Sequence, residues 1–234
     1  MNKYKKIIIC VMLLFFLLLT LFYVCSLSRS KSFTFLKKEG AAVSMEPSIN
    51  FFRKFPRKYP FYRVYSISIF DDDNSIYSIE SIKVFKSLRF LGISGANVED
   101  LTPIKSLESL THLDLSKTRV SEIKPLANLK KIINLNLSFT KISNLKELEK
   151  LTSIEVLDIS NTEVDEVTTL RFLKNLRILN ISNTAVKNIE ILENNQNLQA
   201  IILDDTQINR VVTGHLKNKL PNCIIGNNEI ESPP

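Results

Sequence analysis

The sequence predicts an α/β solenoid, a stack of similar coils with a parallel sheet on one side and short helical turns on the other. A strict period of 22 residues is the first observation, and each period opens with a leucine or isoleucine: Leu88, Leu110, Ile132, Ile154, Leu176 and Leu198. The second observation is that apolar residues return at the fourth, sixth, eleventh, fourteenth, seventeenth and twentieth places of each period. Fixed periods of this length are typical of solenoids, because a single coil cannot bury its own apolar face.

The spacing of apolar residues differs between the two halves of each coil. Leu113 and Leu115 lie two residues apart, so both side chains would lie on one face of a short strand. Val120, Ile123 and Leu126 follow at intervals of three, which suits a 3₁₀ or helical turn. We therefore expect a parallel concave sheet and a convex side made of such turns.

These residues resemble leucine-rich repeats, whose core pattern is LxxLxLxxN. The short period, with Pro103-Ile104 and Pro125-Leu126 in the second half of two repeats, is most similar to the bacterial internalin-type class. A related class of 22-residue repeats occurs in intracellular phosphatase regulators, so the resemblance leaves the compartment open. It covers residues 88 to about 219. It implies a binding protein that uses the concave face of its sheet.

The ninth place departs from the family pattern. The family usually has asparagine there, whereas the first repeat has Ala96. The other five repeats have Thr118, Thr140, Thr162, Thr184 and Thr206. A hydroxyl both donates and accepts, so we expect a threonine ladder that bonds the turn backbone and not a catalytic row of hydroxyls. The turn of the first repeat should be less regular.

Irregular repeats flank the six regular ones at 88–219. We expect a degenerate cap repeat at 66–87, in which Asp71 stands at a place that should be apolar. Its retained apolar residues are Ile69, Ile76, Ile79, Ile82 and Phe85. A C-terminal cap strand is expected at 220–230, before a tail at 231–234. Its apolar residues are Leu220, Cys223, Ile225 and Ile230.

The N-terminal segment predicts a membrane anchor. A basic region at 1–6 precedes an almost uninterrupted apolar run at 7–27. As a helix, this run would span about 31 Å, enough for the hydrocarbon core of a bilayer. It is longer than the apolar part of a usual cleavable signal, so we expect an uncleaved signal anchor. Cleavage after Ser26 or Ser28, or lipid attachment at Cys25, are the alternatives.

The segment 28–65 carries most of the positive charge of the chain. Residues 1–65 have a net charge of +10, whereas 66–234 have −3. Phe51–Tyr65 mixes basic and aromatic residues, which suits either contact with lipid headgroups or covering of the open end of the solenoid. The basic residues near the apolar run number three before it and four after it, so charge alone does not orient it. Because a short basic region before an apolar run is how export signals begin, we expect the repeats outside the cytoplasm.

The sequence offers little catalytic chemistry. The chain has two histidines, His112 and His215, and five glycines, with no glycine-rich phosphate loop. His112 and Asp114 would share one strand face, but structural zinc sites need four suitably spaced ligands. We predict that this protein is not an enzyme and has no metal, no cofactor, no small-molecule substrate and no nucleic-acid partner.

The expected partner is a protein, bound on the concave face. Side chains at the third, fifth and eighth places should point away from the core, and exposed apolar groups among polar ones are typical of binding anchors. The candidate residues are Phe90, His112, Asp114, Asn136, Phe139, Val156, Asp158, Ile178, Asn180 and Ile202. We predict a single-pass membrane receptor, adhesion protein or envelope component. The alternative is a tethered regulator of a cytoplasmic enzyme such as a phosphatase.

Overall fold

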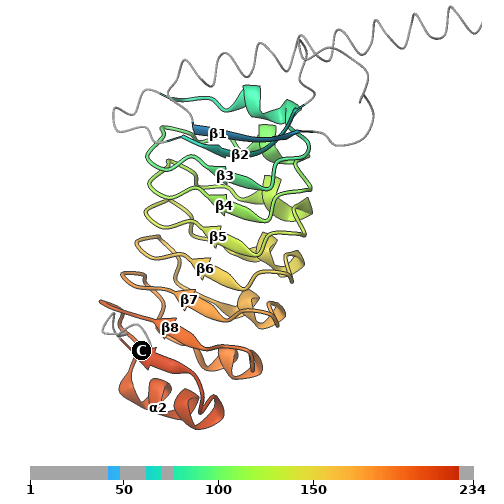
Figure 1. Cartoon of the computed structure of the whole chain (residues 1–234). Coiled ribbons are helices and arrows are strands. Elements are labelled where there is room, and N and C mark those ends of the chain that lie inside the picture. Colours follow the sequence, from blue (N-terminus) through green and yellow to red (C-terminus); the bar gives the residue numbers. More distant parts are fainter. Residues whose placement is uncertain (1–41, 48–61, 70–75, 227–234) are drawn as a thin grey trace, which may run out of the picture.

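A computed structural model describes residues 42–47, 62–69 and 76–226 (Figure 1). Within these ranges nine strands form one sheet in chain order. They are β1 (Ala42–Pro47), β2 (Tyr62–Ser68), β3 (Phe90–Gly92), β4 (His112–Asp114), β5 (Asn134–Asn136), β6 (Val156–Asp158), β7 (Ile178–Asn180), β8 (Ala200–Ile202) and β9 (Ile224–Gly226). All neighbours from β2 to β9 are parallel, and only β1 is antiparallel to its neighbour. The predicted parallel sheet is confirmed.

The other side of each coil is a short helical turn, as the spacing of three predicted. The 3₁₀ helices are η1 (Glu80–Val84), η2 (Thr102–Ile104), η3 (Lys124–Asn128), η4 (Lys146–Lys150), η5 (Thr168–Phe172) and η6 (Glu190–Asn194). Pro103 and Pro125 lie in the first turns of η2 and η3, where a missing backbone N–H costs little. The coils stack with their strands on one side and their helical turns on the other (Figure 1).

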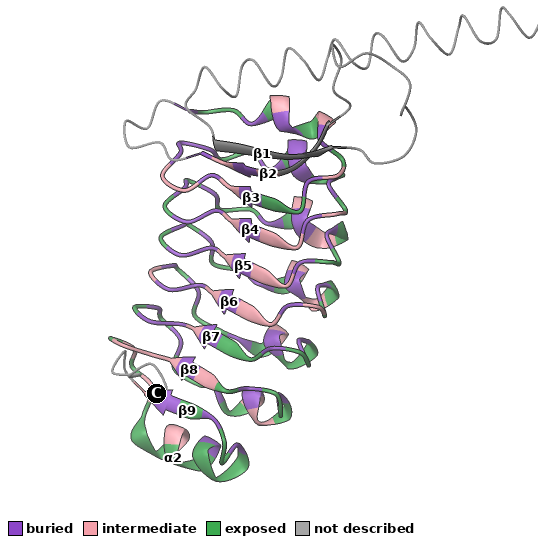
Figure 2. Ribbon diagram, viewed as in Figure 1, coloured by how far each residue is buried: buried purple, intermediate pink, exposed green. Residues whose placement is uncertain are grey.

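The core runs through the whole stack between the strands and the turns. Fourth-place residues pair in register from strand to strand, as Leu113 does with Leu91 and Leu135, and all three are buried. The apolar places of the turns are buried as well, so the buried residues form continuous rows (Figure 2). Because each coil buries its neighbours, no disulfide is needed within this part of the chain. Cys223 is a free, buried thiol, and burial raises its pKa to about 11.

The threonine ladder has the expected role. The hydroxyls of Thr118, Thr140, Thr162 and Thr184 each donate to the carbonyl oxygen three residues earlier at 2.6 Å, and Thr206 does so at 2.8 Å. The first repeat lacks this bond because it has Ala96. Its eighth residue, Gly95, has a φ of 82°, larger than in the later turns. The turn chemistry is thus as predicted.

The N-terminal coil has a different register from the predicted one. Ile67 pairs with Leu91, so it fills the fourth place, and Ile69 fills the sixth. Phe90 lies 24 residues after its partner Ser66, so this coil is two residues longer than the repeats. The interpretation of Asp71 as an intruder at an apolar place was therefore wrong, and Asp71 itself lies outside the described residues. The buried residues of the turn half, including Ile76 and Phe85, are as predicted.

The sheet also extends further towards the N-terminus than expected. β1 and the first residues of β2 fall in the segment 28–65, which was assigned to a juxtamembrane region. Antiparallel pairing of β1 with β2 puts this hairpin at the end of the stack. Most of Phe51–Tyr65 lies outside the described residues, so the choice between headgroup contact and covering of the open end stays open.

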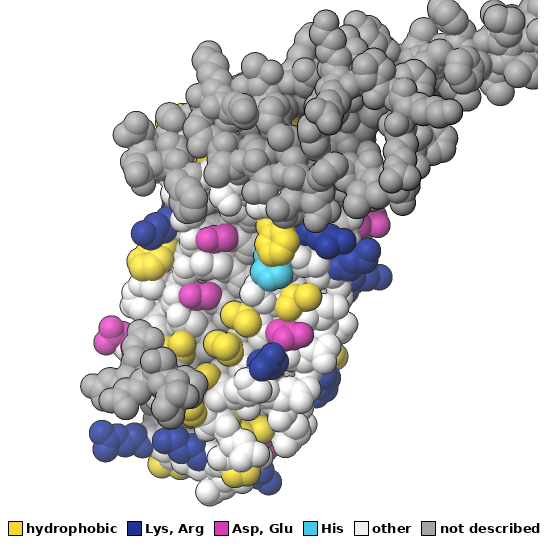
Figure 3. Space-filling model, viewed as in Figure 1, with side chains coloured by type: hydrophobic (Ala, Val, Ile, Leu, Met, Phe, Trp, Pro, Cys, Tyr) yellow, Lys and Arg dark blue, Asp and Glu magenta, His cyan; other side chains and the backbone are white. Residues whose placement is uncertain are grey.

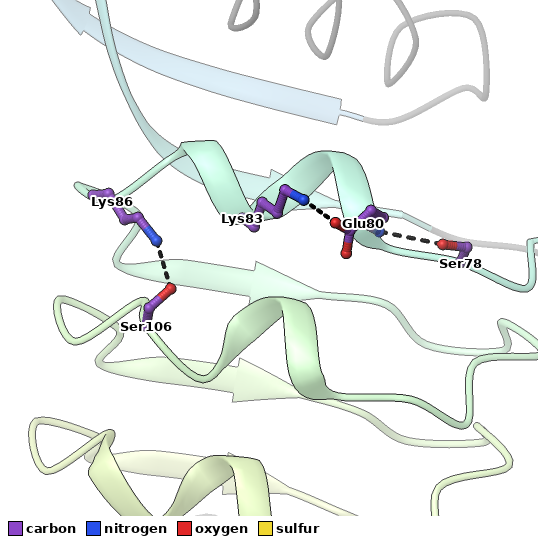
Figure 4. Close-up of polar contacts among 5 residues, drawn as sticks. All are labelled: Ser78, Glu80, Lys83, Lys86 and Ser106. Carbon is purple, nitrogen blue, oxygen red and sulfur yellow. Dashed lines mark hydrogen bonds and ion pairs between the residues drawn. The ribbon is translucent and has the colours of Figure 1, made fainter. Parts of the chain in front are cut away.

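Polar contacts along η1 link the first coil to the next (Figure 4). The Ser78 hydroxyl accepts a hydrogen bond from the backbone N–H of Glu80, and Lys83 forms an ion pair with Glu80. Lys86 donates to the hydroxyl of Ser106 in the neighbouring coil. These groups are exposed, so their contacts help to orient the end coil but contribute little to the free energy of unfolding.

The last coil closes with an α-helix in place of a 3₁₀ turn. α2 (Arg210–Lys219) begins after Asn209, whose side chain accepts from the N–H of Val211 at 2.8 Å. An α-helix rises less per residue than a 3₁₀ helix, so it takes up the two extra residues between β8 and β9. Leu220, Cys223 and Ile225 are buried as predicted, whereas Ile230 lies outside the described residues.

The expected membrane anchor at 7–27 also lies outside the described residues. In the described ranges, no helix combines the length and the apolar character that crossing a bilayer requires.

Candidate functional site

The ten candidate residues lie on one side of the sheet. Third-place and fifth-place side chains of β3 to β8 point away from the core, and together with the eighth place they form what we call the open sheet face (Figure 3). Phe90, Phe139 and Ile178 are exposed. The other candidates are partly buried: His112, Asp114, Asn136, Val156, Asp158, Asn180 and Ile202. Nine of the ten thus lie on strands β3 to β8, and Phe139 lies in the turn that follows β5.

Fifth-place side chains have a structural task that the sequence did not predict. Oδ1 of Asp114 accepts a hydrogen bond from the backbone N–H of Ser116 at 2.9 Å. In the next coil, Oδ1 of Asn136 accepts from the backbone N–H of Ser138 at 3.0 Å. In the two coils after that, Asp158 and Asn180 accept in the same way from the serine two residues later. Each of these side chains therefore uses one terminal atom to hold the turn after its strand. The other terminal atoms of Asp158 and Asn180 bond to each other at 3.2 Å, whereas Oδ2 of Asp114 and Nδ2 of Asn136 have no such bond among the described residues.

A column of serines at the seventh place completes this turn, and the sequence analysis did not single it out. Ser116, Ser138, Ser160 and Ser182 are all buried. The Ser160 hydroxyl donates to Asp158 at 2.6 Å, and the Ser94 and Ser116 hydroxyls lie 2.9 Å apart. The signal was present as a serine in five successive repeats, which is more than a solvent-exposed place requires.

An aromatic hollow lies on the N-terminal half of the open sheet face. Its volume is about 440 Å³, and its lining residues come from β2 to β6 and the turn after β3. The Phe90 and His112 rings stack over it with their centroids 4.4 Å apart. Nδ1 of His112 is 2.9 Å from the Thr111 hydroxyl. Asp114, Asn136 and Asp158 complete the polar part of the lining.

The hollow does not have the donor set of a metal centre. Among the described residues, no three His, Cys, Asp or Glu side chains are close enough to hold an ion. His112 and Asp114 lie on the same strand as predicted, with Asp114 occupied in part by the turn.

An aliphatic column occupies the C-terminal half of the same face. Its third-place residues, on four adjacent strands, are Val156, Ile178, Ala200 and Ile224. Ile202 lies on β8 as well, two residues after Ala200. Ile224 is 55% exposed. The 22-residue period does not predict Ile224 at this place, because the last coil is two residues longer than the repeats and its third place shifts from residue 222 to 224.

Phe139 is unusual in both backbone and exposure. It has a φ of 56°, in the left-handed region, and its side chain is 53% exposed. The Lys117 ammonium lies 5.9 Å from its ring centroid. The other eighth-place residues share this backbone, with φ from 51° to 56° at Lys117, Asn161, Asn183 and Asp205. Asparagine tolerates such a conformation, whereas a bulky aromatic residue there is uncommon.

Comparisons with known proteins find the same kind of repeat fold. The family model described as a leucine-rich repeat region matches residues 42–220. No curated protein sequence matches the chain. Internalin C2 from Listeria monocytogenes is similar in structure, with a TM-score of 0.58 and 27% identity over 70% of this chain and 80% of that one.

Two further solved structures are similar in fold. An internalin from the same Listeria strain has a TM-score of 0.55 and 20% identity, covering 65% of this chain and 51% of its own. A leucine-rich repeat protein from Leptospira interrogans has a TM-score of 0.52 and 23% identity, covering 62% of this chain and 44% of its own. This chain therefore spans most of the first relative and about half of the other two.

Proposed function

The chain belongs to the leucine-rich repeat family, with repeats of internalin type, and from this premise we propose that it captures a protein partner on its open sheet face. It acts by binding and not by catalysis. We further propose that residues 7–27 anchor it in a membrane and that the repeats face away from the cytoplasm.

The observation that carries the binding proposal is the exposure of apolar side chains along the open sheet face. Val156, Ile178, Ala200 and Ile224 stand on four neighbouring strands, whose spacing is about 4.8 Å, so they form one continuous strip. Phe139 adds an exposed aromatic group in the turn that follows β5. A contiguous apolar patch in a polar surrounding is characteristic of protein-binding anchors.

The left-handed backbone of Phe139 supports the same reading. This conformation costs about 1 kcal/mol or more for an ordinary L-residue, and the ring, which is 53% exposed, is buried only in part. Asn161 and Asn183 occupy the same place in the next coils without this disadvantage. A bulky residue at this place, with about half of its side chain exposed, is best explained by contact with a partner.

The test is partner capture by a double variant. Phe139→Ala combined with Ile178→Ala should abolish recovery of cross-linked partners from the native host while the melting curve stays cooperative. The matched control is Phe172→Ala combined with Val211→Ala, since both residues are exposed but lie on η5 and α2, away from the open sheet face. Equal recovery by the two double variants would contradict the proposal.

Topology is tested separately. A compartment-sensitive reporter fused to Pro234, with protease treatment of intact cells, should find the repeats outside and the full-length chain in the membrane fraction. A protected, cytoplasmic repeat domain would instead support the tethered-regulator alternative.

A further inference from the structure

The aromatic hollow combines an aromatic wall with carboxylates. Phe90 and His112 form the wall, and Asp114 on β4 and Asp158 on β6 contribute acidic groups, with Asn136 of β5 between them. Acidic side chains and a histidine lie on the same face in Figure 3, beside the hydrophobic side chains of the sheet. These groups come from β3, β4 and β6, so the core of the solenoid holds them in place.

The described residues of the lining carry negative charge only. Among them are Asp114 and Asp158, and no lysine or arginine. Asp114 uses Oδ1 for the N–H of Ser116, and among the described residues its Oδ2 has no hydrogen-bond partner. Oδ2 of Asp158 accepts only from the Asn180 amide, at 3.2 Å, which is a neutral donor. The described lining therefore offers two carboxylates, and Oδ2 of Asp114 has free acceptor capacity.

We propose that the hollow binds a lysine or arginine side chain of the protein partner. The cation would pair with Asp114, helped by the charge of Asp158, while its apolar stem packs on the aromatic wall. Aromatic rings and carboxylates both favour a cation over a neutral group. This inference rests on the proposed function and adds to it a polar specificity site beside the aliphatic column.

The repeats themselves supply a clean way to remove the charge. Asn136 and Asn180 make the same turn bond as Asp114 and Asp158, so Asp114→Asn and Asp158→Asn should preserve the fold. Asp165→Asn is the matched control, because this exposed residue lies outside the hollow and the change in net charge per substitution is identical.

The experiment is an NMR titration of the full chain with N-acetylarginine amide, and with the neutral isostere N-acetylcitrulline amide. The arginine compound should shift the His112 ring signals and the amide signals of Asp114 and Ser116, whereas the citrulline compound should not. The Asp114→Asn, Asp158→Asn double variant should bind the arginine compound at least about fivefold more weakly. Asp165→Asn should bind it like the unmodified chain.

Each other result overturns the inference. Equal shifts with the two compounds would mean that charge is not recognised, and unchanged affinity of the double variant would mean that the carboxylates are not the site. An absence of shifts at these residues would also reject it. None of these results bears on the aliphatic column or Phe139, so the proposed function would still be decided by partner capture.

Discussion

The hydroxyl of Thr140 donates to the carbonyl oxygen of Leu137 at 2.6 Å, and both residues are buried. The same bond occurs once in each of the five repeats that have threonine at this place. The ladder thus performs with a hydroxyl the task that the family usually gives to asparagine. It ties the end of each strand to the turn that leads out of it.

Replacement of Thr140 by valine should measure the strength of one such bond. Valine keeps the shape of the side chain but removes the donor, so the Leu137 carbonyl loses a buried partner. We expect the free energy of unfolding to fall by about 1–2 kcal/mol in urea titrations. Thr152→Val is the control, because Thr152 is exposed and its substitution should change the stability little.

A second prediction concerns Asn195, which stands at the twentieth place, where four preceding repeats have leucine. It is fully buried, its Nδ2 donates to Leu170 and Leu173, and its Oδ1 has no partner among the described residues. Both carbonyls also accept 3₁₀ backbone bonds, so Asn195→Leu leaves no orphan acceptor. We expect this variant to gain about 1 kcal/mol. Asn195→Asp, which puts a carboxylate beside two carbonyl oxygens, should lower the melting temperature sharply.

Phe139 should show opposite effects on stability and binding. Phe139→Asn removes an aromatic residue from the left-handed backbone and should stabilise the fold by about 1 kcal/mol, while partner capture is lost. The reciprocal change Asn161→Phe, at the same place in the next coil, should destabilise by a similar amount. If thermal melts rank the two variants in the reverse order, strain at the eighth place is not the reason for their behaviour.

The period of the sequence predicted the regular coils but not their ends. Inside the first five repeats, one spacing set both the strand and the turn, so residues such as Leu113 and Leu126 could be assigned directly. The end coils are two residues longer, and a strict period therefore misplaced Ile69 and overlooked Ile224. A cap coil contacts a neighbour on one side only, so its length is less constrained than that of an internal coil.

The candidate site was predictable as a surface but not as chemistry. Alternation along each strand placed His112 and Asp114 on the open face. It could not indicate that Oδ1 of Asp114 is taken by the N–H of Ser116, because that depends on the turn geometry. Similarly, neighbouring strands brought Phe90 beside His112, whereas the stacking of their rings depends on side-chain torsions.

Acid should weaken the start of η2 through Asp100. Oδ1 of Asp100 accepts from the N–H of Thr102 at 2.8 Å, and hydrogen bonding to Thr102 lowers the pKa of this carboxyl below its ordinary 3.8. Because the folded-state pKa is the lower one, the contribution is present above pH 3.8 and is lost as the pH falls through the folded value. Asp100→Asn keeps the turn acceptor, as Asn144 does for Lys146, but cannot titrate.

The measurement for Asp100 is the free energy of unfolding of both proteins from about pH 5 to pH 2. The stability of the unmodified chain relative to Asp100→Asn should decrease as the pH falls over this range. A constant difference between the two proteins would mean that the Thr102 bond does not depend on the charge of Asp100.

The last prediction follows from the register of the stack and contrasts a large deletion with a single substitution. Removal of residues 132–153 takes out one whole coil and joins equivalent places, so the shortened chain should still unfold cooperatively, with a smaller dependence on urea. Ile159→Asp, by contrast, places a charge at a fully buried sixth-place position and should cost more than about 4 kcal/mol. Leu137→Asp should behave in the same way, whereas Lys141→Asp, at an exposed place, should be tolerated. A melt of the Ile159 variant that matches that of the unmodified chain would be incompatible with a core in which every coil buries the next.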